Sequence, residues 1–387
     1  MKELKYLVWL SLVFGSSSGT VWQIINSYDT AYQAYTELIS GLYPVELNEN
    51  QKNNINKVSP DKAGEIISYC QGNDISIVPY TSAEYPESLL KIYNPPPVLY
   101  VRGDVSCLSG DRNITCIGTR RPGEYTKKVI SVICSGLVEN NFTIISGFAV
   151  GCDINAHLSA VRSGGKTICI LGCGVDVNYP APNYRYRREI IGNGGAFVSE
   201  FPPDTSPYAK NFPQRNRILS ALSRATIVFE AGMKSGSLST AGLVRGQNRK
   251  LFCIPPADIT DSRYAGNIYL LRNDALPVYS VNDVLRFYGQ TGNVILPTPE
   301  TKPATKPEIK SENHEKINNT PLLQLTPVQQ KILSVFDGKD TVHMDNIIDS
   351  LDMDISEIIT EIMELIISGI IEEINGNRFR KTERRLF

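Results

Sequence analysis

The chain has 387 residues, too many for one compact domain and suited to two or three of roughly 100 to 200 residues each. Its 42% hydrophobic and 20% charged residues exclude a disordered polymer and a coiled coil, and no apolar run approaches the about 20 residues of a membrane helix. The net charge is −1, yet 19 of the 39 Lys and Arg and only 10 of the 40 Asp and Glu lie between Arg112 and Leu270. The middle of the chain can attract a polyanion that the ends would repel, unless these charges are only scattered solvated faces.

The cysteines and histidines give no sign of a disulfide framework or a metal site. None of the eight cysteines has a C-x-x-C partner, and most lie in apolar runs, which is typical of a reduced, cytoplasmic protein. The three histidines have no second soft ligand nearby in sequence, so we expect neither metal nor cofactor. Lys2, Lys5 and the apolar run 6–15 are similar to a signal peptide, but no clear cleavage site follows, and we expect a first amphipathic helix instead.

The N-terminal segment has a helical pattern. Apolar residues follow helical spacing from Met1 to about Cys70, with a Gly/Ser break at 15–19, so residues 1–72 are predicted to form a small helical domain. After a proline-containing stretch, Val98–Val101 is predicted to be a short edge strand.

From residue 73 to about 290, β-branched runs alternate with helical runs. We expect strands at 114–117, 143–145, 167–171, 196–199, 226–229 and 251–254. Helices are expected at 124–139, 154–162, 184–191, 218–222 and 238–249. This alternation predicts an α/β fold with a doubly wound, mostly parallel sheet.

The C-terminal part begins with a linker at residues 291–322, because four prolines and no aromatic residue between 296 and 319 cannot build a core. Residues 323–387 are predicted to form helices at 328–335, 344–351 and 355–367 and a hairpin around 375–377. Three helices followed by a hairpin are typical of a winged helix.

Four predicted strands are followed by turns of small residues. In a parallel sheet such turns share the carboxyl edge, where backbone N–H groups and helix N-termini favour an anion. A single glycine could simply permit a tight turn, but four turns together predict a phosphate-binding rim. They contain Gly118 and Thr119, then Gly147 and Gly151, then Gly172 and Gly174, and finally Ser235, Gly236 and Ser237.

These turns match no nucleotide-binding motif. The chain has no G-x-x-x-x-G-K-[ST] run, and no G-x-G-x-x-G follows a strand with an acidic residue about 20 positions on. An ordinary dehydrogenase is therefore not expected.

Basic residues lie beside the same turns. Arg120 and Arg121 follow the first turn, and the predicted loop before residue 218 carries Lys210, Arg215 and Arg217. Arg185, Arg187 and Arg188 follow the third turn. Arginine suits phosphate, and an aromatic ring in a basic groove suits single strands whose bases stack on it. Phe212 and Tyr125 are the candidate platforms, although Phe212 could instead fasten its loop to the core.

The motifs resemble the DNA-processing protein A (DprA, also called Smf) family. The resemblance rests on Gly118-Thr119-Arg120, SGFAVGCDINAH (146–157), GCGVDVNYPAPN (172–183), SEFP (199–202), FPQRNRILSALS (212–223) and EAGMKSGSLSTA (230–241). It covers about residues 85–276 and implies an extended Rossmann-like domain, preceded by a small SAM-like domain and followed by a winged helix.

The resemblance also implies a function. Members of the family bind single-stranded DNA, form homodimers, protect incoming DNA and load RecA recombinase onto it during natural transformation. By this resemblance Arg120 would be the principal phosphate contact and 235–237 would receive phosphate. The remaining expected contacts are Lys210, Phe212, Arg215, Asn216 and Arg217.

Three departures from the family pattern weaken parts of this transfer. Val150 stands where some relatives carry a basic residue, and Pro256 replaces a common glycine. The N-terminal helices lack a clear glycine hairpin, which argues against a DNA-binding role for them.

The predicted recognition helix of the winged helix carries Asp354, Glu357, Glu361 and Glu364 but no Lys or Arg. Such a helix should repel phosphate, so we expect a role in protein contact or regulation, although the basic tail 378–385 could bind DNA without specificity.

Catalysis is the alternative. Asp153, His157, Asp176, Glu200 and Glu230 are candidate acid–base groups, and a Rossmann-like scaffold could host a phosphoribohydrolase-like nucleotide enzyme. A fold does not carry an activity, and a helix N-cap at Asp153 with a packed His157 explains that pair more simply. We therefore expect a DNA-binding protein rather than an enzyme.

Overall fold

The computed structural model of the chain describes residues 2–289, 325–351, 358, 361–362, 364–366, 370–374 and 378–382. The chain divides into two compact units, Met1–Gln290 and Thr291–Phe387. None of the helices in the described ranges is both long and apolar enough to cross a membrane.

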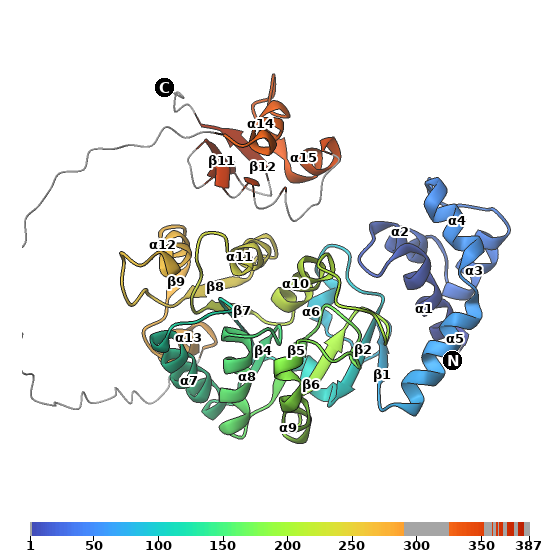
Figure 1. The fold of residues 1–387 in the computed structure, drawn as a ribbon. Coiled ribbons are helices and arrows are strands. Elements are labelled where there is room, and N and C mark those ends of the chain that lie inside the picture. Colours follow the sequence, from blue (N-terminus) through green and yellow to red (C-terminus); the bar gives the residue numbers. More distant parts are fainter. Residues whose placement is uncertain are drawn as a thin grey trace, which may run out of the picture. The chain divides into compact units, whose positions relative to one another are not determined.

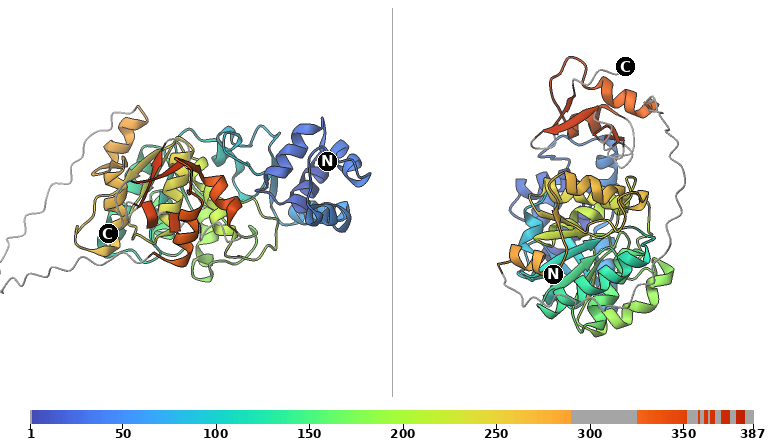
Figure 2. Two further views of the ribbon diagram at one scale, coloured as in Figure 1. Left: turned by 90° about the horizontal axis from the view of Figure 1, so that it is seen from above. Right: turned by 90° about the vertical axis from the view of Figure 1, so that its left-hand side faces the viewer.

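The first unit begins with five helices, as the helical pattern predicts. They are α1 (Lys2–Phe14), α2 (Gly19–Ser27), α3 (Ala31–Ile39), α4 (Glu49–Lys57) and α5 (Pro60–Gly72). Ser18, Thr30, Asn48 and Ser59 each accept a backbone N–H at the start of α2 to α5, which satisfies a donor that the helix leaves free. The α1 helix is buried along Leu7–Leu10, and Figures 1 and 2 show the five helices gathered beside one end of the sheet.

The nine-stranded sheet has the order β1-β2-β6-β5-β4-β3-β7-β8-β9. Its strands are β1 (Ser76–Pro79), β2 (Val98–Gly103), β3 (Asn113–Ile117), β4 (Thr143–Ser146), β5 (Thr167–Ile170), β6 (Ala196–Ser199), β7 (Ala225–Val228), β8 (Lys250–Cys253) and β9 (Leu276–Pro277). The seven strands from β6 through β5, β4, β3, β7 and β8 to β9 are all parallel. By contrast, β1 pairs antiparallel with β2, and β2 pairs antiparallel with β6. The prediction of an edge strand at Val98–Val101 is wrong, because β1, which the sequence pattern missed, pairs with its outer side.

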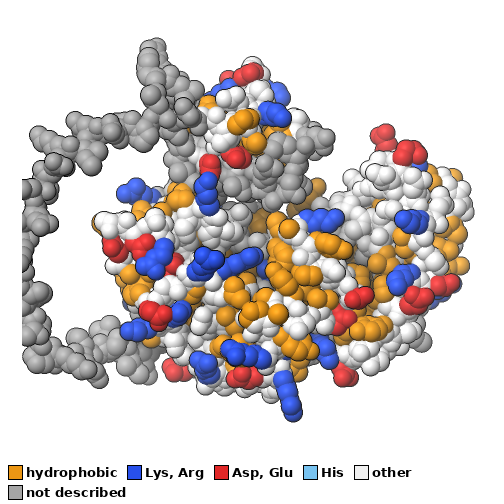
Figure 3. Space-filling model, viewed as in Figure 1, with side chains coloured by type: hydrophobic (Ala, Val, Ile, Leu, Met, Phe, Trp, Pro, Cys, Tyr) orange, Lys and Arg blue, Asp and Glu red, His pale blue; other side chains and the backbone are white. Residues whose placement is uncertain are grey.

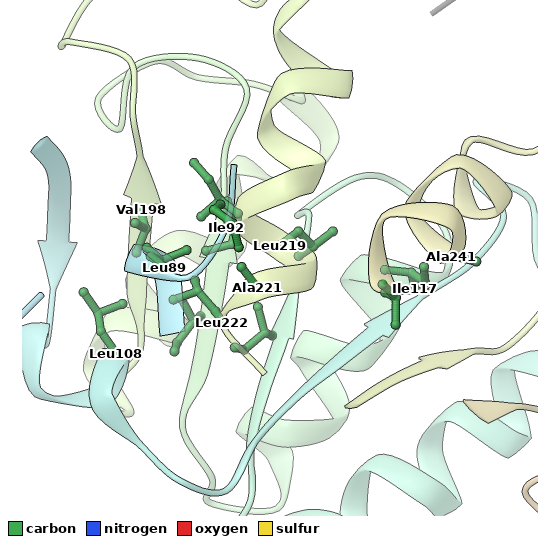
Figure 4. Close-up of a cluster of buried hydrophobic side chains, with 14 of the residues drawn as sticks. Leu89, Ile92, Leu108, Ile117, Val198, Leu219, Ala221, Leu222 and Ala241 are labelled. Atoms are coloured by element: carbon green, nitrogen blue, oxygen red, sulfur yellow. The ribbon is translucent and has the colours of Figure 1, made fainter. Parts of the chain in front are cut away.

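Helices cover both faces of the sheet, which confirms the doubly wound architecture (Figure 1). One face carries α7 (Glu124–Glu139), α8 (Cys152–Arg162), α9 (Arg187–Gly192) and α13 (Val281–Phe287). The other carries α6 (Glu87–Leu90), α10 (Asn211–Ala221), α11 (Gly236–Gly246) and α12 (Ala265–Arg272). Figure 4 shows the core on this second face, where Leu219 of α10 and Leu222 at its C-cap lie in one cluster with Leu89 and Val198.

The α10 helix begins seven residues earlier than the expected start at Ile218. Phe212-Pro213 suggests a loop, but Pro213 lies in the first turn of the helix, where a missing N–H breaks no hydrogen bond. Arg215 and Arg217, which were expected in a loop, therefore lie on a helix, and Lys210 lies at its N-cap.

The second unit contains α14 (Pro327–Ser334), α15 (Met344–Ser350) and a three-stranded antiparallel sheet, in the order β10 (Val342–His343), β12 (Arg378–Lys381) and β11 (Ile371–Ile374). Ile332, Phe336 and Phe379 belong to its core. The predicted linker 291–322, Asp354, Glu357 and the hairpin turn 375–377 lie outside the described residues, so the winged helix stays a prediction.

Two acidic residues of the predicted recognition helix are engaged within the second unit. Glu361 accepts a hydrogen bond from the Thr326 hydroxyl, and Glu364 accepts one from the Gln329 amide. These carboxylates are directed at the start of α14, so their repulsion of a phosphate is weaker than the sequence pattern suggests.

Candidate nucleic-acid interface

The strand order places all four small-residue turns at one edge of the sheet. The strands β5, β4, β3 and β7 are neighbours and run parallel, so the turns that follow them leave from the same carboxyl edge. The chain winds from β3 to β6 in one direction and from β7 to β9 in the other, so its winding reverses between β3 and β7, and ligands of doubly wound sheets bind at such a point. We call residues 118–121, 147–151, 172–174 and 235–237 the rim.

Backbone hydrogen bonds connect three segments of the chain at the rim. The Thr119 N–H donates to the Glu230 carbonyl at 2.7 Å, and the Thr119 carbonyl accepts from the Cys152 N–H at 3.0 Å. The turn after β3 is thereby fixed between the turn after β7 and the start of α8. Arg120 and Arg121, which follow it, are exposed to solvent.

The glycines of the rim permit close packing of these turns. A Cβ at Gly118 would lie 2.4 Å from the Cys152 sulfur, and one at Gly151 would lie 2.4 Å from the Thr119 carbonyl oxygen. Gly151 also has φ +89°, which only glycine adopts without strain. These two glycines are required by neighbouring protein atoms, whether or not a ligand is present.

The structure places Arg215 beneath the rim. The residue is 5% exposed, and its guanidinium donates to the carbonyls of Gly147 and Ile170, the first at 2.8 Å. Across Gly147 lies the Asp153 carboxylate, which accepts from the backbone N–H groups of Gly147 and Ala149. Arg215 thus joins the ends of β4 and β5, and its direct contact with DNA stays a prediction.

Burial decides the titration of this pair. It raises the pKa of the Asp153 carboxyl above its ordinary value, and the Arg215 guanidinium opposes that rise. The expectation that Asp153 is the N-cap of α8 is wrong. The helix begins at Cys152, and Gly151 occupies the cap position.

The third turn is covered by the segment between β6 and α10. The Gly174 N–H donates to the Thr205 carbonyl, and the Gly172 carbonyl accepts from the Asn211 amide. The Phe212 ring packs on Gly172 and lies 5.5 Å from the Tyr179 ring, measured between centroids. Gly172 and Gly174 are therefore buried by protein, and Phe212 keeps a half-buried ring at the border of the rim.

The other expected contacts differ in exposure. Lys210 is exposed at the N-cap of α10, Asn216 is half-buried, and Tyr125 is 42% exposed with its ring edge-on to Tyr264. Arg217 instead donates to the buried Glu200 carboxylate at 2.5 Å. The same Glu200 oxygen accepts from the Ser16 hydroxyl at 2.7 Å, so Arg217 takes part in a network with the N-terminal helices.

The fourth turn begins the α11 helix. The Ser235 hydroxyl accepts from the Ser237 N–H, and a Cβ at Gly236 would meet no atom within 4 Å. This is the open part of the rim, with a helix N-terminus facing it, an arrangement that favours an anion. Figure 3 shows Lys and Arg side chains, with hydrophobic ones among them, across the middle of the larger unit.

The buried acids stabilise the rim. Glu230 accepts from the Gly123 N–H at 3.0 Å and from the Thr126 hydroxyl at 2.5 Å, and so fixes the start of α7. Sequence reasoning found Glu230 only as a candidate catalytic acid, because nothing in the spacing indicates a bond across more than 100 residues. Among the residues described, no group of three His, Cys, Asp or Glu is placed to hold a metal.

His157 is packed in the core, as the simpler interpretation held. It is 0% exposed, its Nδ1 lies 2.6 Å from the Thr167 hydroxyl, and burial lowers its pKa from 6.5 to about 3. Below pH 6.5 the unfolded chain takes up a proton that the folded chain refuses until about pH 3. As the pH falls from 6.5 to about 3, the free energy of unfolding is therefore expected to decrease by about 1.4 kcal/mol per pH unit.

Urea denaturation at pH 7.5, 6.5, 5.5 and 4.5 measures this effect. His157→Gln, which cannot titrate, should show a shallower loss of stability with acid than the wild type. The raised pKa of Asp153 acts in the opposite direction in both proteins, so the difference between them isolates the histidine. Parallel pH profiles of the two proteins would contradict the prediction.

A doubly wound sheet whose carboxyl-edge turns carry exposed arginines and an open helix N-terminus defines a Rossmann-like protein with a rim whose charge suits an anion. The profile of the family described as DNA recombination-mediator protein A matches residues 76–289, and the chain belongs to this family.

Three relatives illustrate the match. Protein Smf of Synechocystis sp. is 32% identical over 317 residues, which cover 77% of this chain and 78% of that protein. The crystal structure of DNA processing protein A from Streptococcus pneumoniae superposes with a TM-score of 0.62 at 28% identity, covering 73% of this chain and 97% of that one. A structure of DNA processing protein A from Helicobacter pylori is described for its single-stranded DNA binding mode. It superposes with a TM-score of 0.50 at 30% identity, covering 55% of this chain and 95% of that one.

Proposed function

We propose that the protein binds single-stranded DNA and that it does so along the rim; the Helicobacter pylori relative is described as a single-stranded DNA binder. The observation that carries the proposal is the convergence of exposed Arg120, the open Ser235–Ser237 turn and the half-buried Phe212 on four adjacent strand ends. Arg120 and Lys210 supply the charge for the phosphates, and Phe212 offers a face to a base.

The buried contacts favour binding over catalysis. Asp153, Glu200 and Glu230 accept hydrogen bonds from protein donors, and His157 is fully buried. An acid–base catalyst must reach its substrate, which these groups do not do in this arrangement. A phosphoribohydrolase-like enzyme remains the alternative.

The finer role follows from the family. We propose that the protein protects incoming DNA, loads RecA recombinase in natural transformation and acts as a homodimer in the cytoplasm. The eight cysteines lie buried as free thiols, which agrees with a reducing compartment. We also propose four segments: a SAM-like domain at 1–72, the DNA-binding domain at 73–290, a linker at 291–322 and a winged helix at 323–387 that contacts protein.

The Arg120→Ala variant tests the proposal. Fluorescence anisotropy with oligothymidylates should show wild-type affinity rising with strand length and falling steeply as salt increases, because phosphate contacts release counterions. Arg120→Ala should lose roughly 10-fold or more in affinity, and its slope of log K against log salt should be smaller by about 0.7.

Arg162→Ala provides the matched control. Arg162 is also exposed but ends α8, at the opposite edge of the sheet, and its loss should leave the affinity unchanged. If binding is independent of strand length and Arg120→Ala matches the wild type, the mononucleotide alternative is favoured and the proposal fails.

A further inference from the structure

Aromatic side chains continue beyond the rim from Phe212. Its neighbour Tyr179 belongs to the segment after β5, and Tyr184 lies five residues further on in the short helix η2 (Ala181–Tyr186). Tyr184 is 49% exposed, and Tyr179 is partly exposed. The Phe212 and Tyr179 rings adjoin, and Tyr184 follows on the same segment; exposed aromatic side chains gathered in one region mark a surface for binding.

Buried contacts hold this segment in place. Arg187 donates to the Val175 and Val177 carbonyls, the second at 2.7 Å, and its guanidinium lies 5.9 Å from the Tyr184 ring centroid. The buried Asn183 amide donates to the Phe148 carbonyl at 2.8 Å. The backbone on both sides of the two tyrosines is fixed, so a ligand would not have to order it on binding.

The charge beside the rings is mixed but leaves cations accessible. Arg185, Arg188 and Lys210 are exposed, and the Arg185 guanidinium lies 4.7 Å from the Tyr186 ring centroid. Glu189 and Asp204 are the exposed acids of the same segments. The Asp176 carboxylate accepts from the Tyr69 hydroxyl of α5 and from the Asp204 N–H, which directs it toward the N-terminal helices.

We propose that Phe212, Tyr179, Tyr184 and Arg185 form a second subsite for single-stranded nucleic acid, here called the aromatic track. A strand that leaves the rim past Phe212 stacks its next bases on the tyrosines, and Arg185 contacts its backbone. This inference rests on the proposed function and extends it. Four adjacent strands span roughly 14 Å at the rim, so only longer strands reach the aromatic track.

The aromatic track makes a prediction about strand length. Stacking is indifferent to base identity, so the gain in affinity should appear with any long sequence. Tyr184→Ala should lose about 5-fold or more in affinity for long oligothymidylates and nothing for the shortest one that the rim binds. Tyr184→Phe, which keeps the ring, should bind as the wild type does.

Anisotropy titrations of the full-length protein with an oligothymidylate series test this. Tyr279→Ala is the control, because Tyr279 is 77% exposed and follows β9 at the other end of the sheet. As a second readout, irradiation with long oligonucleotides carrying 5-iodouracil should crosslink to a peptide that contains Tyr179 or Tyr184.

The outcomes separate the two proposals. Equal affinity of Tyr184→Ala and the wild type at every length overturns the aromatic track while the rim proposal stands. Equal loss at every length also overturns it, because Tyr184 would then act through the rim. A wild-type protein whose binding does not grow with length contradicts the proposed function itself, and the aromatic track with it.

Discussion

Replacing Gly151 by alanine is expected to lower the free energy of unfolding by about 3 kcal/mol or more and to weaken the binding of single-stranded DNA. The added Cβ would meet the Thr119 carbonyl at 2.4 Å and the Arg120 backbone at 2.5 Å, at a residue whose φ is +89°. Thr119 and Arg120 would have to move, and with them the cation on which the binding depends. Urea denaturation and oligothymidylate titration measure the two effects.

Gly164→Ala serves as the matched control for backbone strain. Gly164 has φ +74°, but a Cβ there would meet no atom within 4 Å, so only the conformational cost of roughly 1 kcal/mol should appear. Its DNA affinity should equal that of the wild type. A Gly151→Ala protein as stable as Gly164→Ala would show that the turn after β3 can shift freely, contrary to its hydrogen bonds.

Removing Arg215 is expected to have the second large effect. Arg215→Met leaves the buried Asp153 carboxylate without its cation and removes the guanidinium's hydrogen bonds to the Gly147 and Ile170 carbonyls. Loss of one partner from a buried charged pair costs about 3–5 kcal/mol. The midpoint of urea denaturation should fall accordingly, and DNA affinity should fall with it because the ends of β4 and β5 lose their connection.

A double-mutant cycle with Asp153→Asn distinguishes this role from a phosphate contact. If Arg215 acts through Asp153, the two substitutions should cost less together than the sum of their separate costs in stability. An Arg215→Met protein with wild-type stability and weakened DNA binding would instead make Arg215 a direct contact.

Much of the sheet follows from the sequence. The six strands expected between residues 114 and 254 lie within one residue of their observed ends, and α7 spans Glu124–Glu139 as expected. Short β-branched runs between amphipathic segments leave few other arrangements, and parallel pairing then brings the four turns to one edge. The location of the rim could therefore be predicted.

The environment of the residues in and beneath the rim could not be predicted from the sequence. Nothing in FPQRNR shows that Arg215 points inward, because its acceptors lie 68 and 45 residues away in the chain. The same holds for Glu230, whose partner Thr126 is 104 residues distant. Local patterns set which face a helix buries, but a buried charge depends on partners that only the folded chain brings near.

The hydrogen bond between Ser16 and Glu200 links the loop after α1 to the end of β6, and Val98 and Tyr100 of β2 share a core with α1 to α5. Separate melting of the helical segment would expose that side of the sheet and deprive a buried carboxylate of a donor. We therefore expect residues 2–289 to unfold in a single cooperative transition, and a fragment that starts at residue 76, where the family profile begins, to aggregate through its uncovered β2 surface.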